Sequence, residues 1–122
     1  MTAPVTLALT AGEPGGIGPE LCLQLATEPR SQQVVVVASM ALLEDRKALL
    51  GLDVTLHAWQ PEARVQTVAG QLSVLDVAGI ADTTAGRLDR GNSQYVLDTL
   101  TIAARGCLDG TFDGMVTAPV HK

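Results

Sequence analysis

Residues 12–20 are the part of this chain best suited to chemistry, because they combine four glycines with two carboxylates. Glycines permit backbone angles that side chains forbid, and they let another group approach the main chain closely. If a helix follows such a turn, its first backbone N–H groups are available to a polar ligand. We therefore predict a cofactor- or substrate-binding loop that consists of Gly12, Glu13, Gly15, Gly16 and Gly18.

The ligand of this loop is not predicted to be a bare phosphate. The glycine spacing fits neither the GxGxxG of dinucleotide-binding folds nor the P-loop. Residues 1–29 contain no Lys or Arg, whereas Glu13 and Glu20 add negative charge. A helix dipole contributes only about 0.3–1 kcal/mol per charge. A polar or cationic group fits better, such as an oxidised nicotinamide ring or its ribose hydroxyls. The spacing also allows a purely structural turn, in which the glycines only pack a helix against a strand.

The loop must be positioned by a strand before it and a helix after it. The apolar run Val5–Thr10 predicts a buried strand, and Pro19–Thr27 predicts a helix that begins with a proline. We expect Leu21, Leu25 and Cys22 to form the inward face of this helix.

The rest of the chain continues the alternation of strands and helices. Predicted strands are Val34–Val37, Val54–Trp59, Gln71–Val77 and Gly114–Ala118, and predicted helices are Met40–Leu50 and Asn92 or Ser93 to Leu108. Expected caps are Ser39, Gly51 and Gly110. Expected inward positions are Leu42, Leu43, Leu49 and Leu50, then Val96, Leu100, Ala103, Ala104 and Cys107. The order β-α-β-α-β-β-α-β predicts an α/β layered domain with a largely parallel sheet and flanking helices.

Composition narrows the classes of function. The net charge of -5 argues against a nucleic-acid or anionic-membrane partner. No apolar run reaches the length of a membrane span, and the N-terminus lacks signal-peptide features, so we expect a cytoplasmic protein. Cys22 and Cys107 have apolar neighbours and are expected to be small buried hydrophobes. No cluster of His and Cys indicates a metal site in this chain.

Three separated motifs resemble those of one enzyme family. They are residues 9–21 around the glycine loop, residues 91–97 (Gly-Asn-Ser-Gln-Tyr-Val-Leu), and residues 106–110 followed by 116–122 (Val-Thr-Ala-Pro-Val-His-Lys). In this order they are similar to the 4-hydroxythreonine-4-phosphate dehydrogenases of pyridoxal phosphate biosynthesis. The Gly16–Glu20 segment also resembles the N-terminal turn of isocitrate and isopropylmalate dehydrogenases, which share that family's fold.

The resemblance implies that residues 1–122 are the N-terminal portion of a longer two-domain α/β subunit, so that this chain is an incomplete part of the fold. It implies a homodimer with its active site in the interdomain cleft, a small phosphorylated substrate, NAD, and a divalent metal (Zn, Mg or Co). The family oxidises 4-phosphohydroxy-L-threonine, and decarboxylation then gives 3-amino-2-oxopropyl phosphate for vitamin B6 biosynthesis. The metal polarises the hydroxyl, and hydride leaves to the nicotinamide.

The family's metal-binding histidines lie beyond the end of this chain, so its metal ligands and catalytic residues are not expected here, and the isolated chain is expected to be inactive. His57 lies on an alternating strand and is interpreted as a surface or satisfied residue. His121 and Lys122 are possible substrate contacts at the end of the last strand. Asn92 is interpreted as a helix cap rather than a ligand contact.

Two alternatives stay open from the residues alone. One is a paralogous dehydrogenase of 4-phosphothreonate or 4-phosphoerythronate, which the N-terminal segment does not distinguish. The other is a non-catalytic α/β binding or assembly module. A free-standing module predicts a monodisperse, cooperatively unfolding chain, whereas part of a larger subunit predicts exposed apolar surface.

Overall fold

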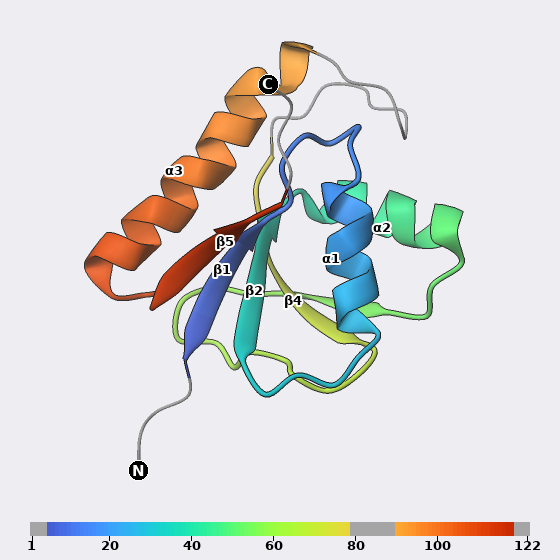
Figure 1. Cartoon of the computed structure of the whole chain (residues 1–122), viewed down its shortest axis with the longest axis horizontal. Helices are drawn as coiled ribbons and strands as arrows, with labels where there is room; N and C mark the ends of the chain where they lie inside the picture. The colour runs from blue at the N-terminus through green and yellow to red at the C-terminus, as the bar shows by residue number, and fades with distance from the viewer. Residues whose placement is uncertain (1–4, 79–89, 119–122) are drawn as a thin grey trace.

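A computed structural model describes residues 5–78 and 90–118 as a parallel sheet with helices on both faces (Figure 1). Its five strands are β1 (Thr6–Thr10), β2 (Gln33–Ala38), β3 (Thr55–Ala58), β4 (Gln71–Asp76) and β5 (Gly114–Thr117). They lie in the order β3-β4-β2-β1-β5, and every recorded pairing is parallel. In the centre, Leu9 is the register partner of both Val36 and Val116. The predicted layered, parallel α/β class is confirmed.

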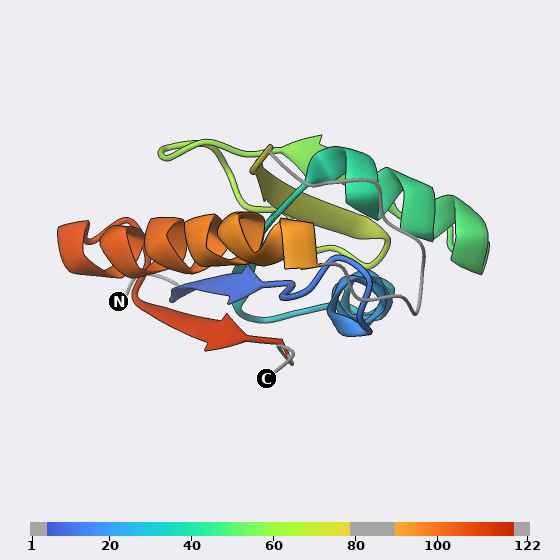
Figure 2. The same cartoon turned by 90° about the horizontal axis from the view of Figure 1, so that it is seen from above.

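The helices divide between the two faces. They are α1 (Gly18–Ala26), α2 (Met40–Leu50) and α3 (Ser93–Asp109), with a 3-10 turn, η1, at Arg90–Asn92. Figure 2 shows α1 and α2 on one side of the sheet and α3 on the other. Right-handed crossovers explain this division. The chain moves one way from β1 to β2, but it moves back across the sheet from β4 to β5.

Each face of the sheet has its own apolar core. On the α1 and α2 side, the buried cluster is Ala11, Cys22, Leu23, Ala26, Val36, Ala38, Leu43, Val54, Leu72 and Val74. On the α3 side it is Ala8, Val35, Val37, Trp59, Val65, Val77, Tyr95, Ala103 and Phe112. Neighbouring valines of β2 point into different cores because side chains alternate along a strand. Both faces of β2 are buried, so its sequence is apolar at successive positions and not only at alternate ones.

The helix ends agree with local sequence signals. The Ser39 hydroxyl accepts a hydrogen bond from the Leu42 N–H at 3.2 Å, so it is the N-cap of α2. Gly51 and Gly110 end α2 and α3 with φ of 68° and 87°, in the left-handed region where glycine is favoured. Asn92 occupies the N-cap position of α3, although its side chain makes no capping hydrogen bond.

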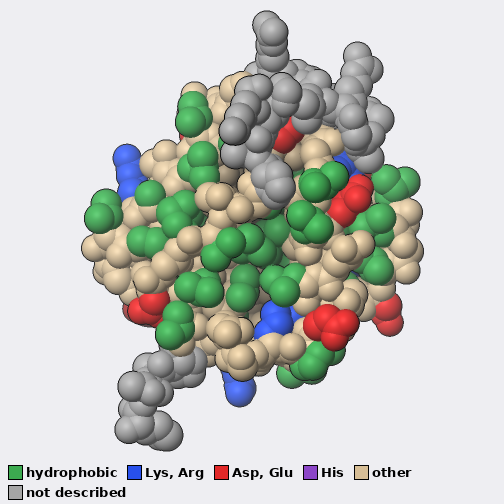
Figure 3. Space-filling view, viewed as in Figure 1, with side chains coloured by type: hydrophobic (Ala, Val, Ile, Leu, Met, Phe, Trp, Pro, Cys, Tyr) green, Lys and Arg blue, Asp and Glu red, His purple; other side chains and the backbone are tan. Residues whose placement is uncertain are grey.

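The predicted inward face of α1 was wrong for Leu21 and Leu25 and correct for Cys22. Leu21 and Leu25 are 45% and 37% exposed, while Cys22, Leu23 and Ala26 face the core. Hydrophobic side chains gather in the middle of the face that Figure 3 presents, in the region of β1, β5 and α1. Spacing of apolar residues predicts a helix but does not determine its rotation when apolar residues lie all around it.

The inward faces of the two other helices were predicted in part, and Ala103 of α3 is buried as expected. In α2, Leu42 and Leu43 are buried as expected, but Leu49 is exposed and Arg46 is fully buried. The three guanidinium nitrogens of Arg46 have no hydrogen-bond partner in the part of the chain that the structure describes. In α3 the fully buried positions are Tyr95, Thr99, Ala103 and Gly106, and Ala104 is exposed. Across residues 5–78 and 90–118, no helix has the length and apolar character needed to cross a membrane.

Candidate functional site

The glycine loop lies where the strand order reverses. β1 lies between β2, which it reaches through α1 on one face, and β5, which is reached through α3 on the other. In open α/β sheets the carboxyl ends of such strands form a crevice that binds ligands. The ends of β1 and β5 are held together there, because the Ala118 N–H donates to the Thr10 carbonyl at 2.9 Å.

The glycines of the loop have different roles. Gly12 has a φ of 76°, which only glycine adopts readily. A Cβ added to Gly18 would lie 1.7 Å from the Ala11 carbonyl oxygen, so this glycine allows the helix to pack against the strand. At Gly16 the nearest atom would be the Glu13 carbonyl oxygen at 3.3 Å, and the Gly16 N–H donates to that oxygen at 3.0 Å. The structural interpretation of the glycines therefore applies to Gly18 most directly.

Two side-chain oxygens at this edge are buried without a partner. Glu13 is 8% exposed and Thr10 is 1% exposed. Neither the Glu13 Oε1 atom nor the Thr10 Oγ1 atom has a hydrogen-bond partner among the residues that the structure describes. An unpaired buried polar group costs about 1–3 kcal/mol, so native structures seldom keep one without a reason. These two oxygens could accept or exchange hydrogen bonds with a polar ligand.

The start of α1 adds backbone donors to the same place. The residue before the helix, Ile17, makes no side-chain cap, and a proline stands in the first turn. Such a helix end leaves N–H groups available to a ligand. Glu20 lies in the first turn of α1, where its negative charge disfavours the binding of an anion. The charge pattern therefore favours a neutral or cationic ligand group, and this ligand class stays a prediction.

At the adjacent junction, from β2 to α2, side chains accept hydrogen bonds from the backbone. The Ser39 N–H donates to the Tyr95 hydroxyl at 2.8 Å, and the Met40 N–H donates to the Asp76 Oδ1 atom at 2.8 Å. Burial raises the pKa of Tyr95 to about 12, against a smaller opposite effect of the Ser39 N–H. Burial likewise raises the pKa of the Cys22 thiol to about 12, so this thiol is poorly suited to act as a nucleophile.

The other predicted site residues have different outcomes. His57 hydrogen bonds through Nε2 to the Gln71 side chain and is half-buried, in agreement with a satisfied residue. His121 and Lys122 lie outside the described residues, and their predicted substrate contacts stay predictions. Thr10 was missed, although a threonine that ends an apolar strand before a glycine loop was a usable signal. Across residues 5–78 and 90–118, no three His, Cys, Asp or Glu side chains are grouped to hold a metal ion.

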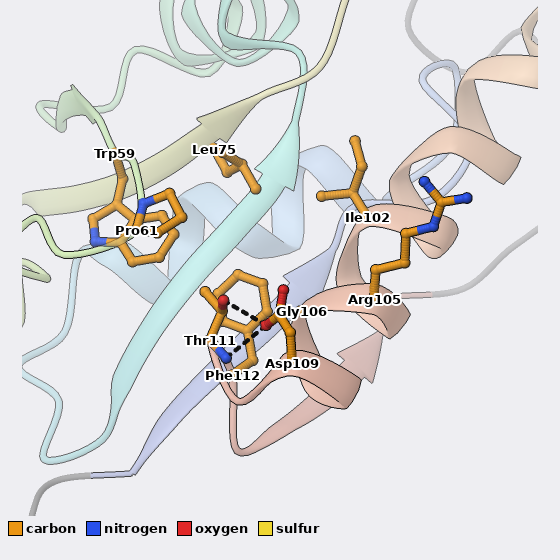
Figure 4. A pocket seen from close by; sticks show the side chains of 9 residues that line it. All are labelled: Trp59, Pro61, Leu75, Ile102, Arg105, Gly106, Asp109, Thr111 and Phe112. Atoms are coloured by element: carbon orange, nitrogen blue, oxygen red, sulfur yellow. Dashed lines mark hydrogen bonds between the residues drawn. The ribbon is translucent and has the colours of Figure 1, made fainter.

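A separate hollow of about 220 Å³ lies on the α3 side of the sheet (Figure 4). Its lining residues are Trp59, Pro61, Leu75, Ile102, Arg105, Gly106, Asp109, Thr111 and Phe112. The rings of Trp59 and Phe112 stack with their centroids 5.7 Å apart. The Asp109 carboxylate accepts hydrogen bonds from the Thr111 N–H and hydroxyl, which hold the pKa of Asp109 below its usual value. None of these residues belongs to the glycine loop.

The fold is that of an open, parallel α/β domain. Its candidate site lies at the switch point, the place where the strand order of the sheet reverses. A solved 4-hydroxythreonine-4-phosphate dehydrogenase from Burkholderia phymatum has the same fold, with a TM-score of 0.87 and 20% identity over 99% of this chain and 38% of that one. The family model of the pyridoxal phosphate biosynthetic protein PdxA matches residues 30–122. This chain belongs to that family.

Curated relatives agree with this assignment. A 4-hydroxythreonine-4-phosphate dehydrogenase from Marinobacter nauticus is 68% identical over 122 residues, which are 100% of this chain and 36% of the relative. One from Pseudomonas aeruginosa is 52% identical over 120 residues, covering 94% of this chain and 36% of the relative. The chain therefore spans about a third of the length of these relatives.

Proposed function

We propose that this chain supplies one wall of the active site of an NAD-dependent 4-hydroxythreonine-4-phosphate dehydrogenase in pyridoxal phosphate biosynthesis. Family membership and the dehydrogenase names of the curated relatives support the reaction class. The observation that carries the role of this chain is the pair of buried, unpartnered oxygens of Thr10 and Glu13 at the switch point.

The loop's part in the reaction is binding and orientation. Bound NAD would supply the acceptor for the hydride of the substrate's 3-hydroxyl. The Glu13 carboxyl group can accept hydrogen bonds from a ribose hydroxyl, from the nicotinamide amide or from the substrate's amino group. Thr10 can accept one hydrogen bond and donate another. Because both side chains are buried, these bonds would form in a region of low dielectric, where they hold a ligand most strongly.

The remaining chemistry is assigned to other parts of the subunit. The described residues offer no grouped metal ligands, so no step through a metal is derived for this chain. NAD, the divalent metal, the homodimer and decarboxylation to 3-amino-2-oxopropyl phosphate are part of the proposal and rest on the family resemblance. The same reasoning predicts that the isolated 122-residue chain is inactive.

A chimera provides the direct test. In it, this chain replaces the matching segment of the 68% identical Marinobacter nauticus relative. With NAD, divalent metal and 4-phosphohydroxy-L-threonine, we expect the chimera to form NADH and the isolated chain to form none. Glu13→Gln should lower kcat/KM about tenfold or more, since it weakens an acceptor in a buried site. Glu28→Gln, at an exposed position, is the matched control.

The outcomes separate the possible ligands of Glu13. A rise in KM for NAD alone would assign Glu13 to the cofactor, and a rise for the phosphorylated substrate alone would assign it to the substrate. Unchanged kinetics in Glu13→Gln and in Thr10→Val would return the loop to a purely structural role. Faster turnover of 4-phosphothreonate or 4-phosphoerythronate than of the amino substrate would instead favour the paralogous dehydrogenase.

A further inference from the structure

The outer side of α3 carries an apolar stripe. Figure 1 shows this helix at one border of the molecule, and its buried positions face the sheet. We call the stripe on the opposite side the α3 seam, and it consists of Leu97, Thr101, Ala104 and Leu108. Leu97 and Leu108 are 56% and 89% exposed, and the two residues between them are exposed as well. Two exposed leucines on one stripe of a single helix indicate a surface for an apolar partner.

The spacing of the α3 seam is that of a coiled-coil contact. Its residues follow one another at steps of four, three and four, which is the alternation of the apolar positions in a heptad. At 3.6 residues per turn these side chains share one narrow stripe about three turns long. The buried Tyr95, Thr99 and Gly106 lie on the other side of the same helix. The seam is therefore directed at a neighbouring helix and not at the core of this domain.

The order of side-chain sizes along the seam is the same in both directions, with a leucine at each end and two small residues in the middle. In an antiparallel pair of such helices, related by a two-fold axis, Leu97 lies opposite the partner's Leu108. Thr101 then lies opposite the partner's Ala104, where two small side chains let the helices approach closely. The α3 seam is thus complementary to itself.

One flank of the seam carries two opposite charges. Asp98 and Arg105 are one heptad apart, so they lie on the same flank of α3. The two-fold rotation brings equal flanks together, and a rise of 1.5 Å per residue places Asp98 within about 3 Å, along the helix axis, of the partner's Arg105. This contact occurs twice in the pair. A parallel pair would instead place this flank against the uncharged flank of Leu100 and Cys107, so the charges favour the antiparallel direction.

Both charges are available to a partner. Among the residues that the structure describes, no ion pair holds Arg105, and its guanidinium group points away from the Phe112 ring (Figure 4). The Asp98 Oδ1 atom accepts a hydrogen bond from the Gln94 side chain at 2.8 Å, and a carboxylate can accept further hydrogen bonds from an arginine. Asp109, one turn after Arg105, accepts its hydrogen bonds from Thr111.

We propose that the α3 seam binds the α3 seam of a second copy of this chain, in an antiparallel and two-fold symmetric helix pair. The leucines supply the apolar burial, and the charges select the partner and the direction. A single helix pair is a small interface, so the association should be weak and reversible. The contact is made by α3 alone. It does not depend on the proposed dehydrogenase activity, and it is additional to any homodimer that other parts of the subunit form.

Charge reversal tests both the partner and the direction. Sedimentation equilibrium measures the self-association of the parent chain, of Asp98→Lys and of Arg105→Glu. Each single variant places like charges opposite one another at two contacts, so its dissociation constant should rise about tenfold. An equimolar mixture of the two variants restores opposite charges at both contacts and should associate as tightly as the parent. Asp45→Lys reverses an exposed charge on α2 and should leave the association unchanged.

Lysine substitutions test the apolar part of the contact. Leu97→Lys and Leu108→Lys each place a charge within the seam and should raise the dissociation constant by at least about tenfold. Leu49→Lys, at a position of α2 that is 65% exposed, is the matched control. All these side chains are exposed in the single chain, so circular dichroism should show the same helix content in each lysine variant as in the parent.

Other outcomes overturn the inference. A parent chain that remains monomeric at about 1 mM would have no useful affinity for itself. A dimer that neither seam lysine weakens would use another surface. Single charge reversals that weaken the dimer without recovery in the mixture would refute the antiparallel pairing. If the isolated chain does not remain folded, the Marinobacter nauticus chimera is compared instead: Leu108→Lys should lower its assembly mass and Leu49→Lys should not, and equal masses would refute the contact.

Discussion

Two strand-to-helix junctions lie side by side at the carboxyl edge of the sheet, and they are built differently. At the β2–α2 junction, Ser39 caps the helix and the backbone N–H groups of Ser39 and Met40 have side-chain acceptors. At the β1–α1 junction the helix has no side-chain cap, and Glu13 and Thr10 each bury an oxygen without a partner in the described structure.

We interpret the β2–α2 junction as one that stabilises the fold and the β1–α1 junction as the proposed binding site. Side chains already accept hydrogen bonds from the Ser39, Met40 and Leu42 N–H groups at the start of α2, so a ligand would gain little from these donors. The open junction keeps donors and acceptors unpaired at a cost in stability, as functional sites commonly do. If this interpretation is correct, substitutions at the paired junction should destabilise the chain, and removal of an orphaned group at the open junction should stabilise it.

Gly18→Ala should have the largest effect, because it attacks the packing on which the open junction depends. The new Cβ would lie 1.7 Å from the Ala11 carbonyl oxygen, and backbone must move to relieve the clash. We expect a loss of at least about 3 kcal/mol in the free energy of unfolding, measured by urea denaturation. Gly16→Ala, where the nearest atom is 3.3 Å away, should cost clearly less. Equal losses would mean that Gly18 has no special packing role.

Alkaline pH should have the second-largest effect, a loss of stability that arises at the paired β2–α2 junction. The pKa of Tyr95 is raised from 10.0 to about 12, chiefly by burial. Its contribution to stability is therefore complete below pH 10 and is lost as pH rises through 12, at up to about 1.4 kcal/mol per pH unit. Cys22, raised from 9.0 to about 12, adds a similar loss that begins near pH 9. Urea midpoints across pH 8–11 should fall, and Tyr95→Phe should remove the Tyr95 part of the slope. A Tyr95→Phe slope identical to that of the parent would refute the assignment.

Ser39→Ala should cost about 1 kcal/mol, since it removes the cap of α2 and leaves the Leu42 N–H without its acceptor. A thermal melt followed by circular dichroism measures the loss. The exposed Ser31 provides the control, and Ser31→Ala should change stability by less than about 0.5 kcal/mol. If both serines behave alike, the paired junction is not held by its cap.

Glu13→Met should act in the opposite direction, with the smallest effect. It replaces a buried carboxyl group that lacks a partner at Oε1 by an apolar side chain of similar size. We expect the free energy of unfolding to rise by about 0.5–1 kcal/mol. Glu28→Met, at an exposed position, should be neutral. Destabilisation by Glu13→Met would show that the carboxyl group supports the fold, and the contrast between the two junctions would then fail.

Local signals predicted much of the architecture. The strand of four consecutive valines, the Ser39 cap and the Gly51 and Gly110 helix ends were predicted within a few residues of their observed positions. Each depends on neighbours in the chain: β-branched side chains disfavour helix, and caps satisfy the nearest backbone groups. The directions of the helices were less predictable. Leu21, Leu25 and Leu49 were expected inside and are exposed.

The candidate site was predicted in part. Glycine spacing and the absence of basic residues predicted a polar, non-phosphate loop at the start of a helix, and the structure puts that loop at the switch point. The pairing state of Thr10 and Glu13 was not predictable, because it depends on whether other parts of the chain bring a partner to each oxygen. Tyr95 is the clearest example: it reaches Ser39 across 56 positions of sequence.

By itself, then, the sequence determined the elements, their order, most of their caps and the place of the glycine loop between a strand and a helix, because these follow from interactions between residues close in the chain. Only the tertiary structure decided that β1 lies between β2 and β5, which flank of α1 stays open, and which polar groups at the sheet edge are satisfied. Those features depend on strand pairing and packing between distant segments. A hydrophobic period of 3.6 or 2 residues shows that a helix or strand has an apolar face, but it does not show which segment packs against that face.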